Sequence, residues 1–152
     1  MTGAGQPASS RGQALVEFVL VAPVFFLLIF AVIEGGRFIL YYETLSNATR
    51  EGARYAIVHG SNSFCPSGPM PPGINPPGCY DPSGANVVQR VEDMAFGLLG
   101  TGVAVTPTWG PLGNGREAEV RVAATYTYQT LIPLVPLPAI TISAESTLVI
   151  NN

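Results

Sequence analysis

The sequence predicts an α+β protein: a long N-terminal transmembrane α-helix extended as a stem, followed by a small head in which one helix packs on a three- to four-stranded antiparallel sheet. An apolar run near the N-terminus predicts the transmembrane helix, and a change in apolar spacing after Gly100 predicts the head. Of the 152 residues, 47% are hydrophobic and only 11% are charged. This composition, with a net charge of −3 and no basic cluster, excludes a disordered acidic tail and a nucleic-acid-binding protein.

The first predicted element is a membrane-spanning helix at residues 13–36. The run from Ala14 to Ile33 is apolar apart from Glu17, and as a helix it spans roughly 30 Å, the thickness of a bilayer's hydrocarbon core. A core helix of a soluble protein would show a polar face. A removable signal peptide has a shorter apolar run and a small-residue cleavage site, whereas this run ends in Ile33-Glu34-Gly35-Gly36-Arg37. We therefore expect the segment to remain in the protein as a single span.

Glu17 is the one charged residue in this run. An ionised carboxylate within an apolar span costs about 2–3 kcal/mol by insertion scales, so a Glu17 that lies in the bilayer core requires a partner. The alternative is an acid close enough to the interface to reach the lipid headgroups. Glu17 is therefore the candidate functional residue of the span.

A second helical pattern continues from the span as a stem over residues 37–60. Apolar and small residues recur every three or four positions with polar residues opposite, which is typical of an amphipathic helix. The members of this face are Phe38, Tyr41, Tyr42, Leu45, Ala48, Gly52, Tyr55 and Ala56. We expect the face to pack either against the stems of neighbouring molecules or only against the head of its own chain.

Residues 61–82 form a Pro/Gly-rich loop that contains both cysteines of the chain, Cys65 and Cys79. Two thiolates with no nearby His cannot complete a tetrahedral zinc site, and their spacing is not that of a C-x-x-C redox motif. We expect a Cys65–Cys79 disulfide, which would stabilise the fold by roughly 3 kcal/mol in the chain-entropy model. A disulfide implies an oxidising compartment, so this part of the chain is expected outside the cytoplasm.

Residues 83–152 are expected to form the α+β head. Asp81-Pro82-Ser83 is predicted to open a helix that stops at Gly100; its apolar stripe is Val87, Val88, Val91, Met94, Ala95, Leu98 and Leu99. Alternating segments at 103–109, 120–129 and 140–150 predict strands. A turn signal at Asn114-Gly115 separates the first two strands. A Pro-rich link precedes the last one and contains Pro133, Pro136 and Pro138.

The sequence contains no recognisable catalytic constellation. His59 is the only histidine, and we expect a surface or packing role for it. Motifs for a serine nucleophile, a zinc protease or a phosphate-binding loop are missing. Glu92-Asp93 and Glu117/Glu119 are expected to be solvated acids. Trp109, beside Gly110-Pro111, is expected to pack at a strand end, the alternative being an exposed contact residue. We therefore expect no enzyme activity, no metal site, no cofactor and no small-molecule substrate.

The start of the apolar run resembles the processing site of type IV prepilins, a Gly followed by four residues and then Glu-Phe or Glu-Tyr. Here Gly12 precedes Gln13, and Glu17-Phe18 completes the pattern. In that family a membrane aspartyl peptidase cuts after the Gly, and the Glu pairs with a freed N-terminal amine during assembly. The resemblance implies a cytoplasmic leader over residues 1–12, a cut between Gly12 and Gln13, and an assembly charge at Glu17.

A wider set of motifs is similar to the TadE-like family, whose members are minor pilin-like proteins of the tight-adherence (Flp) pilus system. The resemblance covers residues 11–58. Its motifs are Arg11-Gly12-Gln13-Ala14-Leu15-Val16-Glu17-Phe18, Pro23, Glu34-Gly35-Gly36-Arg37 and Arg50-Glu51-Gly52-Ala53-Arg54-Tyr55-Ala56. It implies a non-enzymatic minor pseudopilin that serves the biogenesis or structure of a type IV-like pilus.

The resemblance also implies partners and a location. The partners are membrane lipid, a prepilin peptidase, other pilin-like subunits and the pilus assembly platform, with no nucleic acid among them. The location is the inner (cytoplasmic) membrane, crossed once with the N-terminus cytoplasmic and the C-terminal domain extracytoplasmic, or an extracellular pilus. The alternative is a membrane-anchored extracytoplasmic binding module that is never processed. The two differ in whether the chain is cut after Gly12.

Overall fold

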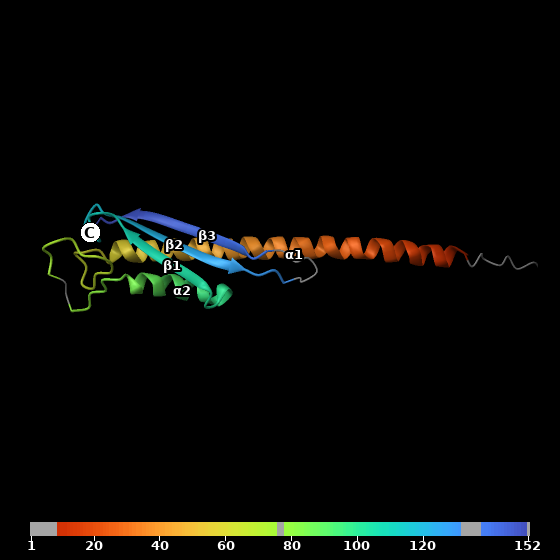
Figure 1. The fold of residues 1–152 in the computed structure, drawn as a ribbon, viewed down its shortest axis with the longest axis horizontal. Coiled ribbons are helices and arrows are strands. Elements are labelled where there is room, and N and C mark those ends of the chain that lie inside the picture. The colour runs from red at the N-terminus through yellow and green to blue at the C-terminus, as the bar shows by residue number, and fades with distance from the viewer. Residues whose placement is uncertain (1–8, 76–77, 132–137, 152) are drawn as a thin grey trace, which may run out of the picture. The chain divides into compact units, whose positions relative to one another are not determined.

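The computed structural model describes residues 9–75, 78–131 and 138–151. Its elements in chain order are α1 (Ser9–Val58), α2 (Ala85–Leu99), β1 (Val103–Trp109), β2 (Glu119–Tyr128) and β3 (Ile140–Val149) (Figure 1). The chain divides into two units, Met1–Arg37 and Phe38–Asn152. Residues 1–8 of the expected leader, and Pro133 and Pro136 of the expected link, lie outside the described residues.

The first unit contributes the apolar part of α1. The helix begins at Ser9, before the expected start at Gln13, so Gly12 lies inside the first turns. A glycine disfavours a helix by about 1 kcal/mol relative to alanine. Serine is a residue type that favours helix starts, and the good helix formers Gln13 and Ala14 follow Gly12, so the helix extends through this position. Pro23 also lies inside the helix.

In the second unit, the strands form an antiparallel sheet in the order β1-β2-β3. Trp109 pairs with Val120 across the first ladder, and Ala124 pairs with Ala144 across the second. The expected three- to four-stranded sheet therefore has three strands within the described residues. The turn signal at Asn114-Gly115 lies inside a longer connection, residues 110–118, and is not a tight two-residue hairpin turn. The reason is a tertiary contact: Asn114 is fully buried, and its side-chain amide donates to the carbonyl oxygens of Ser67 and Gly68.

One face of the sheet is covered by helices and carries the hydrophobic core. Strand β2 alternates as the sequence predicts, with Val120, Val122, Ala124 and Tyr128 buried and the residues between them mostly exposed. Helix α2 buries a narrow stripe made of Val87, Val91, Ala95 and Leu99. Met94, which the sequence analysis placed in this stripe, is 50% exposed. It lies at the margin of the stripe, because α2 buries only residues spaced by four.

The part of α1 that follows Arg37 packs against the head of its own chain. Leu45, Ala48, Ala53 and Ala56 are at most 1% exposed and belong to the common core. Nearer the start of the unit, aromatic rings join the helix to β2. The ring of Phe38 lies 5.5 Å from that of Tyr128, and the ring of Tyr41 lies 5.6 Å from that of Tyr126. From the sequence, this amphipathic face is expected to pack either against the stems of neighbouring molecules or against the head of its own chain. In the structure it packs against the head of its own chain.

Gly52 is the point at which α1 approaches both α2 and the sheet. A Cβ atom at Gly52 would lie 2.3 Å from Cγ2 of Val91 on α2 and 3.4 Å from Cγ1 of Val122 on β2. The first distance is far shorter than a normal carbon–carbon contact. The absence of a side chain at Gly52 therefore permits the close packing of these three elements.

The Pro/Gly-rich loop is closed on itself by the disulfide and is joined to the start of α2 by Asp81. Cys65 and Cys79 are joined with their Cα atoms 5.1 Å apart. The Asp81 carboxylate accepts hydrogen bonds from the Ser67 hydroxyl (2.8 Å) and from the Asn86 amide (2.9 Å) at the start of α2. Gly84 stands at the N-cap in a left-handed conformation and has no side chain to cap the helix. Asp81 therefore supplies the missing acceptor for the helix N-terminus.

Trp109 fills the space between the loop and α2. A Cβ atom at Gly68 or at Gly84 would lie 2.4 Å or 2.2 Å, respectively, from atoms of the Trp109 ring. Both glycines have a positive φ, 101° and 72°, so the ring packs directly on backbone that a larger residue would strain. Trp109 is thus packed at the end of β1, as the sequence analysis expects.

We predict that Gly52→Ala destabilises the second unit by about 1–3 kcal/mol, because the added methyl group overpacks the contact with Val91. Gly97→Ala is the matched control, since Gly97 also lies in a helix but a Cβ atom there would have no heavy atom within 4 Å. The control should stabilise by about 0.5–1 kcal/mol through helix propensity. Urea unfolding of the full chain in detergent, followed by fluorescence of the single tryptophan, measures both. Equal effects of the two variants would contradict the close packing at Gly52.

We predict that Asp81 makes the stability of the second unit depend on acid pH. Burial raises the pKa of this carboxyl, but hydrogen bonds from the Asn86 amide and the Ser67 hydroxyl outweigh it, so the pKa lies below its usual value. The stabilisation is therefore present above the unfolded-state pKa of about 3.9 and is lost as the pH falls through the lower folded-state pKa. Asp81→Asn should reduce the free energy of unfolding by up to about 1 kcal/mol at neutral pH. The difference from the wild type should disappear in strong acid. Asp93→Asn, at an exposed site on α2, is the control and should unfold at neutral pH with nearly the wild-type free energy.

Candidate processing and assembly segment

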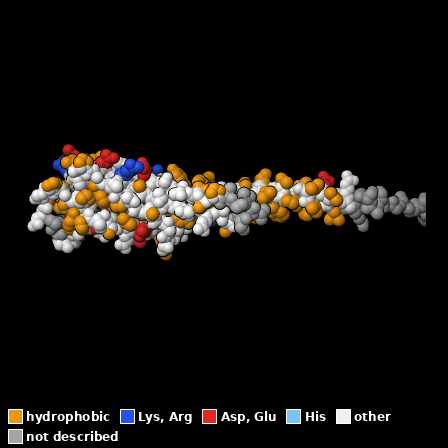
Figure 2. All heavy atoms as spheres, viewed as in Figure 1, with side chains coloured by type: hydrophobic (Ala, Val, Ile, Leu, Met, Phe, Trp, Pro, Cys, Tyr) orange, Lys and Arg blue, Asp and Glu red, His pale blue; other side chains and the backbone are white. Residues whose placement is uncertain are grey.

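The first unit presents an apolar surface that nothing in the described residues covers. The most apolar 18-residue window of this helix has a mean hydropathy of 2.8, and none of the window is buried. Figure 2 shows hydrophobic side chains along this part of α1. Exposed large residues include Leu15, Phe18, Leu20, Phe25 and Leu28. A core helix of a soluble domain would be mostly buried, so this surface is suited to lipid or to other apolar helices.

Glu17 lies within this apolar surface. Its side chain is exposed, and among the described residues it takes part in no hydrogen bond or ion pair. Leu15, Val16, Phe18 and Val19 on either side of it are all more than half exposed. The chain therefore places a carboxylate in an apolar segment and supplies no partner for it from the described part of the fold.

Gly12 has open surroundings, in contrast to Gly52. A Cβ atom at Gly12 would have no heavy atom within 4 Å, so the fold has no steric need for a glycine there. The bond between Gly12 and Gln13 lies close to the start of α1 at Ser9. Helix ends fray readily because their first amides lack intrahelical acceptors, so this bond is more accessible to a peptidase than one in the middle of α1.

Charged residues reappear at the far end of the apolar segment. Arg37 donates to Glu34 at 3.2 Å, and both side chains are partly buried. This pair is the first opposite-charge contact along α1 in the described residues after Glu17. It marks the expected boundary of the span on the side of the second unit, where Arg side chains can reach polar headgroups.

One side of α1 packs on the core and the other carries exposed charges in the segment Arg50-Glu51-Gly52-Ala53-Arg54-Tyr55-Ala56. Gly52, Ala53 and Ala56 face the core, whereas Arg50 and Arg54 are exposed. In the sequence this segment is a family motif and part of the amphipathic stem, and no site is predicted at its arginines. Their spacing by four residues places them on one helix face, and that spacing is the signal that could have identified them.

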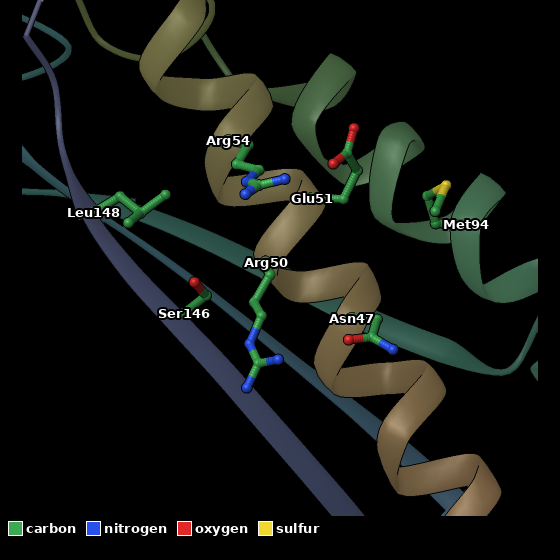
Figure 3. Close-up of a pocket in the computed structure, with 7 residues that line it drawn as sticks. All are labelled: Asn47, Arg50, Glu51, Arg54, Met94, Ser146 and Leu148. Carbon is green, nitrogen blue, oxygen red and sulfur yellow. The ribbon is translucent and has the colours of Figure 1, made fainter.

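The two arginines line a groove of about 540 Å³ on the surface of the second unit (Figure 3). We name it the arginine groove; its lining residues are Asn47, Arg50, Glu51, Arg54, Met94, Ser146 and Leu148. Glu51 is paired with Arg90 of α2 at 2.8 Å. Among the described residues, Arg50 and Arg54 form no hydrogen bond or ion pair. The groove therefore has a positively charged wall on α1.

His59 packs on the last turn of α1. Its ring stacks on that of Tyr55 with the centroids 3.9 Å apart, and its Nδ1 lies 2.9 Å from the carbonyl oxygen of Tyr55. Of the two roles expected from the sequence, surface or packing, His59 therefore has a packing role. The described residues contain no group of three or more His, Cys, Asp or Glu side chains that could hold a metal ion.

Comparison with known proteins finds similarity to a protein family. No curated protein and no solved structure matches the chain. Residues 12–54 match the family model described as TadE-like protein, which confirms the resemblance found in the sequence. The matched segment runs from Gly12 through the apolar part of α1 to Arg54. Together with one helix long and apolar enough to cross a membrane, the TadE-like segment fits a pilin-like membrane protein.

Proposed function

We propose that this protein is a non-enzymatic minor pilin-like subunit of a tight-adherence, type IV-like pilus system, processed after Gly12 and assembled through the N-terminal part of α1. The observation that carries the proposal is Glu17, an exposed carboxylate without a partner in the described residues, five positions after Gly12 within a membrane-length apolar helix. The TadE-like match over residues 12–54 supports it.

The proposed role of Glu17 follows from the cost of burying a charge. In the bilayer, the carboxylate is stabilised only by a group of opposite charge or by hydrogen-bond donors. A cut after Gly12 creates a positively charged amine on Gln13 at the same end of the helix. When the apolar helices of two subunits dock, Glu17 of one subunit meets the amine of its neighbour. The pair then fixes the axial register of the two helices, since other registers leave both charges unpaired.

The proposed topology places residues 1–12 in the cytoplasm and the second unit outside it. The Cys65–Cys79 disulfide supports this orientation because disulfides persist in oxidising compartments. The location is then the inner membrane, crossed once, with passage into a pilus as a further step. The proposed partners are membrane lipid, a prepilin peptidase, other pilin-like subunits and the pilus assembly platform.

The second candidate function is an anchored binding module that is never processed. The arginine groove favours it, because the second unit carries a recessed, charged surface of its own. This function needs neither a cut at Gly12 nor a partner for Glu17. The next two experiments separate the two functions.

We predict that the chain isolated from native membranes begins at Gln13, and that Gly12→Glu blocks this cut. The large charged side chain hinders a peptidase that must approach the backbone closely. The fold itself should tolerate the change, since no atom lies within 4 Å of a Cβ at Gly12. N-terminal sequencing and intact mass measure the cut, and Gly5→Glu, in the same leader, is the control that should still be cut. A full-length wild-type chain in membranes that contain the peptidase would exclude processing.

We predict that Glu17→Ala inserts into the membrane and is cut normally but fails to join its partners. Loss of one member of a buried ion pair costs about 3–5 kcal/mol, which lowers an association constant more than a hundredfold. Crosslinking and co-purification with other pilin-like subunits, at equal membrane levels, measure this loss. Glu43→Ala, at an exposed site outside the apolar segment, is the control that should retain partners. If Glu17→Ala captures partners as the wild type does, Glu17 has no role in assembly and the anchored module is favoured.

A further inference from the structure

The arginine groove lies beside a sheet edge that is open to pairing. In the part of the chain that the structure describes, β3 pairs with β2 on one side and with no strand on the other. Strand β3 contains no proline, whereas the opposite edge strand, β1, contains Pro107. Proline and covering helices protect sheet edges from unwanted pairing, and α2 packs against β1. Strand β3 therefore has the edge better suited to accept another strand.

The groove and the open edge share residues. Ser146 and Leu148 of β3 line the groove together with Arg50 and Arg54 of α1, and Figure 3 shows Arg50 extending toward β3. A second hollow continues the groove along β3, lined by Arg50, Ser143 and Ala144 among others. A strand added to β3 would therefore place its inward-facing side chains next to the two arginines.

The charges nearby favour an acidic occupant. Three other arginines, Arg37, Arg90 and Arg121, have carboxylate partners within the chain. Arg50 and Arg54 have none among the described residues, and Glu51 beside them is occupied by Arg90. Guanidinium groups bind carboxylates with two parallel hydrogen bonds. The groove is thus suited to carboxylates from outside the chain.

We propose that the open edge of β3 and the arginine groove form a docking site for an extended segment of another protein that carries two acidic residues two positions apart. The segment adds to the sheet as a strand by main-chain hydrogen bonds. Residues four apart on α1 are separated by about 6 Å along the helix, and alternate residues of a strand by about 6.6 Å. In Figure 3, α1 and β3 run in the same general direction. The spacing between the two arginines therefore matches the spacing between alternate residues of an added strand, so each arginine can bind one carboxylate.

A second copy of this chain is a poorer occupant. The chain has one acidic pair at this spacing, Glu117 and Glu119. Glu119 is already paired in β2 with Val149 of β3, and the Glu117 amide donates to the Ile150 carbonyl oxygen. This segment is therefore not available as a free strand. The proposal concerns the second unit alone and does not depend on the cut at Gly12 or on Glu17.

The test uses the full chain in detergent and a fluorescent synthetic peptide of alternating Thr and Val with two Glu residues two positions apart. We expect saturable binding by fluorescence anisotropy, and slower amide hydrogen exchange over residues 143–149 when the peptide is bound. Arg50→Gln or Arg54→Gln should each weaken binding about tenfold, through loss of charge-assisted hydrogen bonds. Arg116→Gln is the control, because Arg116 is exposed and lies outside the groove; it should bind as the wild type does.

Three results would overturn the proposal. A peptide with Gln in place of both Glu residues that binds equally well would exclude the role of the carboxylates. Binding without slower exchange on β3 would exclude strand addition, even if the arginine variants weaken it. Self-association that protects β3 and is abolished by the same variants would identify a second copy as the occupant. Urea unfolding of each variant, compared with the wild type, ensures that weaker binding is not caused by loss of the fold.

Discussion

The close approach of α1 to α2 and β2 at Gly52 is the contact on which the second unit depends. A methyl group there would lie 2.3 Å from Cγ2 of Val91, so any other residue would require Val91 or the helices to move. Ala48, Ala53 and Ala56 extend the same small-residue surface along α1. These small residues let the backbone of α1 lie close to the sheet. At the start of the unit the packing changes to aromatic rings, with Tyr128 packed edge-on against Phe38.

Much of the fold could be predicted from the sequence because its patterns are local. The spacing of apolar residues located α1, α2 and all three strands to within a few residues, and the two cysteines allowed only one disulfide. The features that could not be predicted arise from tertiary contacts. Asn114-Gly115 has the sequence of a tight turn, yet the buried Asn114 amide binds the disulfide loop and the connection is longer. Met94 fits the apolar stripe of α2, but the stripe that is buried is narrower.

Of the candidate site, only the residues that lie close together in the sequence could be predicted. Gly12 and Glu17 are neighbours in sequence, and a single charge in an apolar run is visible without a structure. The arginine groove could not be found in this way, because its walls come from α1, α2 and β3. The sequence places Ser146 and Leu148 far from Arg50 and gives no sign that they meet. Its one local signal is the spacing of Arg50 and Arg54 on the same helix face.

Glu17 differs from Arg50 and Arg54 in its surroundings, and therefore in how strongly each charge favours binding a partner. Glu17 lies among apolar side chains, and in the core of a bilayer its charge is costly without a partner. If Glu17 lies in the bilayer core, an interaction there is strongly favoured, and salt in the surrounding water screens it little. Arg50 and Arg54 face solvent and are stable without a partner, so an interaction there is optional and weakens as ionic strength rises. The same helix thus carries one charge suited to permanent assembly and two suited to reversible recognition.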